Sequence, residues 1–236
     1  MTGGPNFYYT WTPAHPTASR VSTSRTEILH LLLAFGVLTF DLVILLGGGG
    51  LLSAGRGGLF AFVSVTVVLA AAAAALTGFL CHELAHKFYA QRHGFWAEFR
   101  MSPMGLVISL ITAFAGFLWA APGATMVSGM ADYDLARWGK TSLAGPVTNA
   151  FFGGIFYVGA LAAFLVGSAY SPWFVLLAWF NGWFATFNLL PFGPLDGAKV
   201  LRWSKPAWIV AIAAFGAFTA VATLVLYGVT TPLLGT

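Results

Sequence analysis

The chain has 236 residues, of which 58% are hydrophobic and only 8% are charged, and its net charge is +4. Soluble domains carry about 25% charged residues, so this composition excludes an ordinary soluble protein and indicates a polytopic membrane protein in a lipid bilayer. In such a protein a basic excess orients the chain in the membrane, so nucleic acid is not expected as a partner.

Residues 1–27 are polar and rich in Thr, Ser and Pro. They lack the apolar core of a signal peptide, so we expect a polar N-terminal tail that stays on the protein. We expect residues 28–236 to form a single transmembrane domain, because too few polar residues remain to build a soluble module.

A membrane span needs about 20 mainly apolar residues, and six segments approach that length. We predict an all-α polytopic membrane protein with about five to six transmembrane helices. In chain order the candidate segments are Ile28–Leu46, Leu59–Arg92, Gly105–Ala121, Ser142–Val166, Trp173–Leu190 and Pro206–Tyr227.

The third segment, Gly105–Ala121, has only 17 residues. If it crossed the membrane fully, the basic residues after the second and fifth segments would lie on opposite sides. If it is re-entrant, ten of the eleven basic residues share one side, which the positive-inside rule makes cytoplasmic. We therefore predict five crossings and one re-entrant segment, with the N-terminus inside.

The strongest chemical signal is the sequence from His82 to His86, which reads His-Glu-Leu-Ala-His at the end of the second segment. Positions i and i+4 of a helix share one face, so both histidines can bind one zinc ion. Glu83 lies beside them, close enough to act on a water held by the zinc. Polar residues of this kind are costly in an apolar segment, which favours a metal site over a chance match.

A catalytic zinc ion usually has three protein ligands, so one of the seven acidic residues is expected to complete the site. Asp41 lies toward the far end of the first span, away from His82. Asp196 follows the fifth segment on the same predicted side as the histidines, after Pro191 and Pro194, which favour an extended course. We predict Asp196 as the third ligand; the alternative is a turn-forming Asp-Gly pair at a helix end.

These residues, together with two further motifs, resemble the site-2 protease family of intramembrane zinc metalloproteases. The family pattern N-x-x-P-x-x-P-x-D-G is met at Asn188–Gly197, and G-P-x-x-N is met at Gly145–Asn149. The resemblance covers about residues 59–202. No sequence resembles the PDZ or CBS modules of some relatives, so a minimal form is expected.

The resemblance implies one zinc ion per chain, held by His82, His86 and Asp196, with Glu83 as the catalytic residue. It assigns Asn149 either to polarising the substrate carbonyl or to positioning the site. It also implies a β-type segment in the membrane beside the site. We expect residues 122–129 to be an edge strand that pairs with substrate; the alternative is a plain connecting loop.

The expected function is hydrolysis of a peptide bond within or near the transmembrane segment of a membrane-anchored protein, that is, regulated intramembrane proteolysis. The expected location is the cell membrane, with the active site toward the cytoplasmic side. The alternative is a non-proteolytic membrane metal-binding protein or transporter. A transporter would place His and Asp in the membrane, but it would not need Glu83 between the two histidines.

Overall fold

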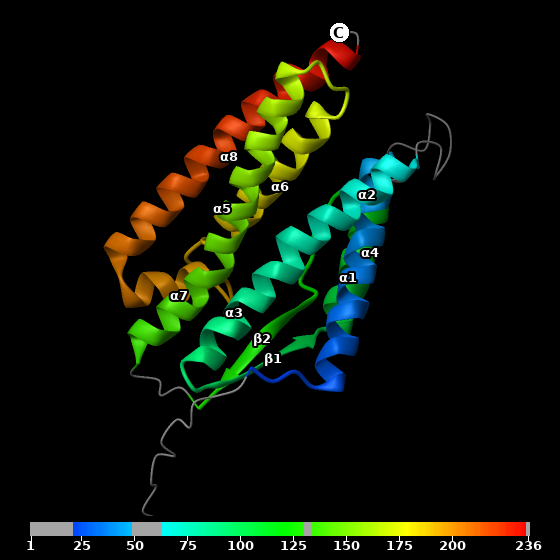
Figure 1. Ribbon diagram of the computed structural model, residues 1–236. Helices are drawn as coiled ribbons and strands as arrows, with labels where there is room; N and C mark the ends of the chain where they lie inside the picture. The colour runs from blue at the N-terminus through cyan, green and yellow to red at the C-terminus, as the bar shows by residue number, and fades with distance from the viewer. Residues whose placement is uncertain (1–20, 49–62, 130–133, 235–236) are drawn as a thin grey trace, which may run out of the picture.

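The computed structural model describes residues 21–48, 63–129 and 134–234 and is mostly helical (Figure 1). A two-stranded sheet lies near one end of the helices. The elements in chain order are α1 (Arg25–Leu46), α2 (Val65–Ala74), η2 (Ala75–Leu80), α3 (Cys81–Arg92), β1 (Trp96–Met101), α4 (Pro103–Phe114), β2 (Gly123–Ser128), α5 (Leu135–Leu165), α6 (Ser171–Asn188), α7 (Asp196–Trp203) and α8 (Lys205–Leu234).

Within the described residues, four helices are long and apolar enough to span a membrane. The expected five to six transmembrane helices are therefore not confirmed. The segment that falls short is α6, because its Trp and Asn residues lower its mean hydropathy. Asn181 of α6 is fully buried, and α6 packs on α5 and α8, so this polar side chain faces protein. The four helices that are long and apolar enough to span a membrane are α1, the continuous helix Val65–Arg92, α5 and Lys205–Gly228 of α8.

The segment predicted to be re-entrant leaves the sheet and returns to it. The backbone N–H of Ser102 donates to the carbonyl oxygen of Pro122 over 2.8 Å, so the two ends of the segment lie side by side. A Cβ atom on Gly105 would lie 1.8 Å from the carbonyl oxygen of Ala121; only glycine allows this approach. The geometry agrees with the re-entrant path and differs from a full crossing.

The expected strand at residues 122–129 is present as β2, which confirms that prediction, whereas β1 was not predicted. The strands are antiparallel, with Phe99 opposite Thr125. The N–H of Phe99 points away from β2 and donates to Glu27, so Phe99 and Thr125 form a non-hydrogen-bonded pair. The N–H of Thr125 therefore lies on the outer edge of β2, which has no partner strand among the described residues.

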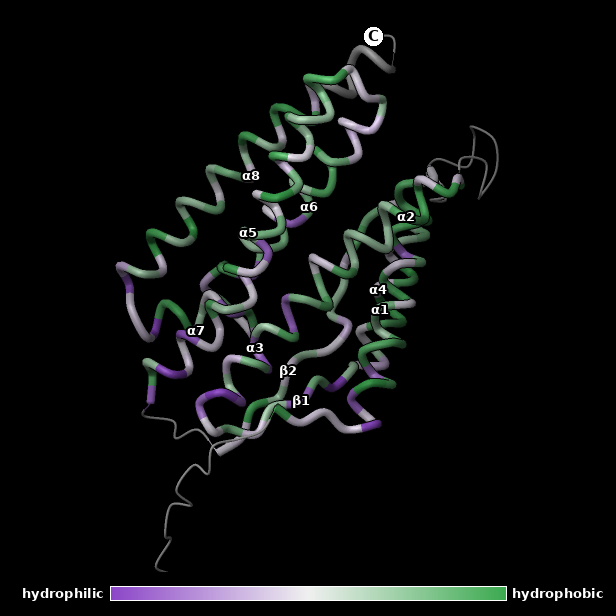
Figure 2. The backbone as a smooth tube through the Cα atoms, in the orientation of Figure 1, coloured by the Kyte–Doolittle hydropathy of each residue, from purple (hydrophilic) through white to green (hydrophobic). Residues whose placement is uncertain are grey.

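Hydrophobic residues follow the helices, and hydrophilic residues gather at the end that carries the sheet and α7 (Figure 2). The main apolar core lies where α1 packs on α2 and η2. Ala34 and Ala71 are completely buried there, and such small side chains let helices approach closely in a membrane. This packing holds the first helix against the one that continues into His82 and His86.

Candidate metal centre

His82 and His86 lie one turn apart on α3, and Asp196 is the first residue of α7. The Nε2 atoms of the two histidines are 3.0 Å apart. The Oδ2 atom of Asp196 lies 3.3 Å from the Nε2 atom of His82 and 3.1 Å from the Nε2 atom of His86. Ligands about 2.1 Å from a tetrahedral zinc ion are separated by about 3.4 Å. These three side chains, all buried, therefore form a group able to bind one zinc ion.

The other ring nitrogen of each histidine contacts an oxygen. The Nδ1 atom of His82 lies 2.6 Å from the Oδ1 atom of Asn149, and the Nδ1 atom of His86 lies 2.7 Å from the carbonyl oxygen of Thr141. Both oxygens can only accept, so each Nδ1 carries the proton and each Nε2 is left with a free electron pair. This is the tautomer that a metal at Nε2 requires.

The side chain of Asn149 is fully buried. Its Nδ2 donates to the carbonyl oxygens of Thr77 and Gly78 over 3.2 and 2.9 Å and approaches the Oδ1 atom of Asn181 at 3.3 Å. Thr77 and Gly78 belong to η2, a π-helical turn of the kind often found at functional sites. The structure thus places Asn149 behind His82, with both ends of its amide bonded within the protein.

Asn181 was not singled out in the sequence. It is fully buried, and its Nδ2 donates to the hydroxyl of Thr77 and to the carbonyl of Leu177, both over 3.0 Å. Its position in the middle of an apolar segment was the one signal in the sequence that could have identified it, because an asparagine there needs hydrogen-bond partners inside the protein.

Gly145 faces the two imidazoles from α5. A Cβ atom at this position would lie 2.5 Å from the Nε2 atom of His86 and 2.6 Å from that of His82. Any larger side chain would occupy the space beside the Nε2 atoms of the two histidines. In the G-P-x-x-N motif the glycine therefore keeps that space open, and the asparagine is hydrogen-bonded to one of the two histidines.

Asp196 is held in place by the chain that precedes it. A Cβ atom on Gly197 would lie 2.0 Å from the carbonyl oxygen of Leu189, and the same oxygen accepts a 2.7 Å hydrogen bond from the Nε1 of Trp208. The carboxylate of Asp196 is therefore fixed beside the two imidazoles, where it is able to bind a cation together with them.

Glu83 points toward the sheet and is held there by Thr125 of β2. Its Oε2 atom accepts from the N–H and from the hydroxyl of Thr125, both over 2.8 Å. The same hydroxyl lies 3.0 Å from the carbonyl oxygen of Glu83. Thr125 carried no signal in the sequence, because a single threonine in a short strand is ordinary.

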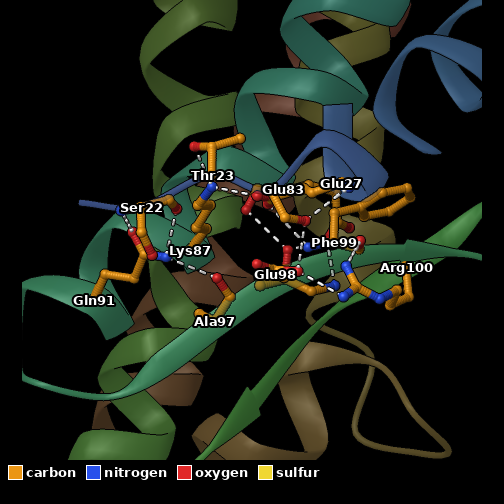
Figure 3. A network of polar contacts seen from close by, with 12 residues as sticks. Ser22, Thr23, Glu27, Glu83, Lys87, Gln91, Ala97, Glu98, Phe99 and Arg100 are labelled. Carbon is orange, nitrogen blue, oxygen red and sulfur yellow. Dashed lines mark hydrogen bonds and ion pairs between the residues drawn. The ribbon is translucent and has the colours of Figure 1, made fainter. Parts of the chain in front are cut away.

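Lys87, one turn beyond Glu83 on α3, forms a buried ion pair with Glu27 of α1. Lys87 donates to Glu27 of α1 and to the hydroxyl of Thr23, and Glu27 also accepts from the N–H of Phe99 over 3.0 Å. Lys87 is 1% exposed and Glu27 is completely buried. Figure 3 shows how this pair joins α1, α3 and β1. In the sequence, Glu27 is the last residue of the expected polar tail, and no motif indicates that Lys87 is its partner.

Two named relatives match this chain in sequence. It is 35% identical over 156 residues to a protein of Methanocaldococcus jannaschii named "Putative zinc metalloprotease MJ0611", a match that covers 62% of this chain and 76% of the relative. The chain belongs to the site-2 protease family of zinc metalloproteases. It is also 33% identical over 134 residues to a Mycobacterium tuberculosis protein named "Putative zinc metalloprotease Rip3". That match covers 54% of this chain and only 28% of the relative.

No family model matches the chain, and no solved structure matches it. As a member of the site-2 protease family it is a membrane metalloprotease whose cofactor is zinc. The group formed by His82, His86 and Asp196 is able to bind that ion.

Proposed function

We propose that the chain hydrolyses a peptide bond within or near the transmembrane segment of a membrane-anchored protein. The observation that carries this proposal is the location of the metal centre. Its two histidines lie on the apolar helix Val65–Arg92, which is long enough to span a membrane, and its ligands are buried between that helix, α5 and α7. A centre carried by apolar, membrane-spanning helices favours a substrate that lies in the membrane itself.

We assign metal binding to His82, His86 and Asp196. Zinc, when bound, supplies Lewis acidity and makes water a competent nucleophile near pH 7. Glu83 is proposed as the general base that takes a proton from the attacking water and returns it to the leaving amine. One carboxylate can serve both steps, because the proton it accepts in the first is the proton it donates in the second.

We assign Asn149 to positioning and not to direct contact with the substrate carbonyl. Its side chain has no exposed surface, and its Oδ1 is bonded to His82. Residues that bond the outer nitrogen of a metal-binding histidine fix the ring orientation and raise its basicity. Asn181 would support this role by holding the amide of Asn149.

The substrate must be extended to be cut, because a helical peptide bond is shielded by its own hydrogen bonds. The outer edge of β2 would replace those bonds with strand pairing. It adjoins Glu83 through Thr125, so a segment paired there would lie beside the general base. A polypeptide that unwinds next to this strand is thus the substrate class that the site favours.

We propose that the active site opens toward the cytoplasmic side of the cell membrane. The described lysines and arginines lie near the start of α1, the end of α3, β1, the start of α5, α7 and the start of α8. Hydrophilic residues gather at this same end in Figure 2. A concentration of basic residues at one end of the spans is typical of the cytoplasmic side.

The experiment for this proposal uses purified protein in liposomes with a model single-span substrate. Wild type should cleave it, and Glu83→Gln should bind zinc equally well but lose about 10²- to 10⁴-fold in rate, the usual contribution of a general base. If Glu83→Gln cleaves at the wild-type rate, the assignment of Glu83 is wrong. If wild type cleaves only soluble peptides, the intramembrane substrate class is wrong.

A further inference from the structure

Thr125 binds the general base with two different groups. Its backbone N–H and its hydroxyl both donate to the same carboxylate oxygen of Glu83, Oε2, over 2.8 Å. Both contacts end on that one oxygen, so Oε1 can serve the proton transfer. A half-buried carboxylate that accepts from two donors is well oriented.

The backbone donor of Thr125 lies where a substrate strand would pair. Successive residues of an antiparallel strand point their N–H groups to alternate edges, so Thr125 and Val127 both present theirs to the outer edge of β2. In the described part of the chain, the N–H of Thr125 is bonded to Glu83. An extended substrate that adds to this edge would compete with Glu83 for the N–H.

On the side that faces β1, further contacts fix the position of β2 relative to α3. Glu27 binds Phe99, which is opposite Thr125 in the sheet, and also binds Lys87, one turn from Glu83. The contacts form a closed ring that runs through α3, β2, β1 and α1. This ring restrains movement of the whole sheet, so a change at the outer edge of β2 would act on the contact between Thr125 and Glu83.

We propose that Thr125 is a positioning residue that couples the outer edge of β2 to the carboxylate of Glu83. When a substrate strand pairs with β2, its carbonyl takes the N–H of Thr125, and the hydroxyl alone then holds Glu83 beside the bond to be cut. The backbone donor thus selects an extended substrate, and the side-chain donor keeps the base in place during catalysis. This inference rests on the intramembrane protease function proposed above.

The test compares Thr125→Val, which removes the hydroxyl at almost constant shape, with Thr125→Ser, which keeps it. Misplacing a catalytic group can cost about 10²-fold, so kcat should fall about 10- to 100-fold in Thr125→Val, with KM within about twofold and zinc content unchanged. Thr125→Ser should stay within about threefold of wild type. Thr39→Val is the matched control, because the hydroxyl of Thr39 bonds only within α1.

A wild-type kcat in Thr125→Val would overturn the proposal. An equal loss in Thr125→Ser would also overturn it, because the threonine methyl group and not the hydroxyl would then be responsible. These results are distinct from failure of the protease function. If wild type cleaves and Glu83→Gln does not, a wild-type kcat in Thr125→Val refutes only the role of Thr125.

A second measurement does not depend on activity. In zinc-free protein, Glu83→Ala should speed hydrogen exchange of the Thr125 amide about 10-fold or more, because its acceptor is lost. The amide of Met126 is the internal control, since it points toward β1 and should keep its exchange rate. Unchanged exchange at Thr125 in this variant would contradict the contact on which the proposal depends.

Discussion

The imidazole of His82 donates from Nδ1 to the Oδ1 of Asn149 over 2.6 Å. Asn149 in turn donates to two carbonyls of the π-helical turn that precedes His82. The same asparagine therefore orients the ring and stabilises the irregular backbone that leads into the motif. A metal ligand held in this way has its rotamer and its tautomer fixed before the ion arrives.

Replacing Asn149 with alanine should weaken zinc binding without removing a ligand. Loss of a residue that orients a metal-binding histidine costs about 10- to 100-fold in affinity or activity. Competition with a chelator of known affinity measures the change. Thr148→Val is the control on the neighbouring residue, because its hydroxyl bonds only to a carbonyl of its own helix. Unchanged affinity in Asn149→Ala would contradict the orienting role.

A methyl group at Gly145 should prevent zinc binding. It would lie 2.5–2.6 Å from the Nε2 atoms of both histidines, so the rings would have to move out of the geometry that brings them to one ion. Zinc content after purification measures the effect. Gly154→Ala is a control on the same helix, since a Cβ atom there meets nothing within 4 Å. If Gly145→Ala keeps a full complement of zinc, the position of the metal is wrong.

Breaking the buried Lys87–Glu27 pair from one side should destabilise the protein strongly. Lys87→Met leaves the carboxylate of Glu27 buried without its cation, and such changes cost about 3–5 kcal/mol. The double variant Lys87→Met/Glu27→Gln should recover part of this loss, because no charge is then buried alone. Denaturation in detergent micelles measures both.

The exposed pair Arg137–Asp134 is the control for that experiment. Its arginine side chain is 55% exposed, and surface pairs contribute about 0–1 kcal/mol. Arg137→Met should therefore change stability little. A Lys87→Met variant no less stable than Arg137→Met would show that the buried pair does not stabilise the fold.

The proposed orientation can be checked by cysteine labelling after Cys81, the one cysteine of the chain, is replaced with serine. New cysteines at Asp134 and Lys199 should react with a membrane-impermeant reagent only from the cytoplasmic side. Both positions lie at the end of the protein that carries the sheet and the basic residues. Labelling from opposite sides would contradict the predicted path of the chain.

The main helices, and the grouping of His82, His86 and Asp196, were predictable because their signals are local. The spacing of His82 and His86 fixes their common face, and the motif around Asp196 names a third ligand. The strand at residues 122–129 was predicted as well. By contrast, β1 was missed, although Ala97–Met101 alternates apolar and charged residues as a strand does.

The contacts that position the site were not predictable, because they join distant parts of the chain. Glu27 and Lys87 are separated by 60 residues, and neither residue alone indicates its partner. Thr125 reaches Glu83 only because the sheet places it there. The span at α6 was uncertain for another reason: its polar residues face other helices, and hydropathy does not distinguish a buried face from a lipid-facing one.

We propose that His82, His86 and Asp196 hold the zinc ion with which Glu83 cleaves a membrane substrate. The most direct test measures zinc content and cleavage together in wild type, His86→Ala, Asp196→Ala and Glu83→Gln. Wild type and Glu83→Gln should each retain about one zinc ion per chain, both ligand variants should lose it, and only wild type should cleave. Full zinc content in Asp196→Ala, or cleavage by Glu83→Gln at the wild-type rate, would contradict these assignments.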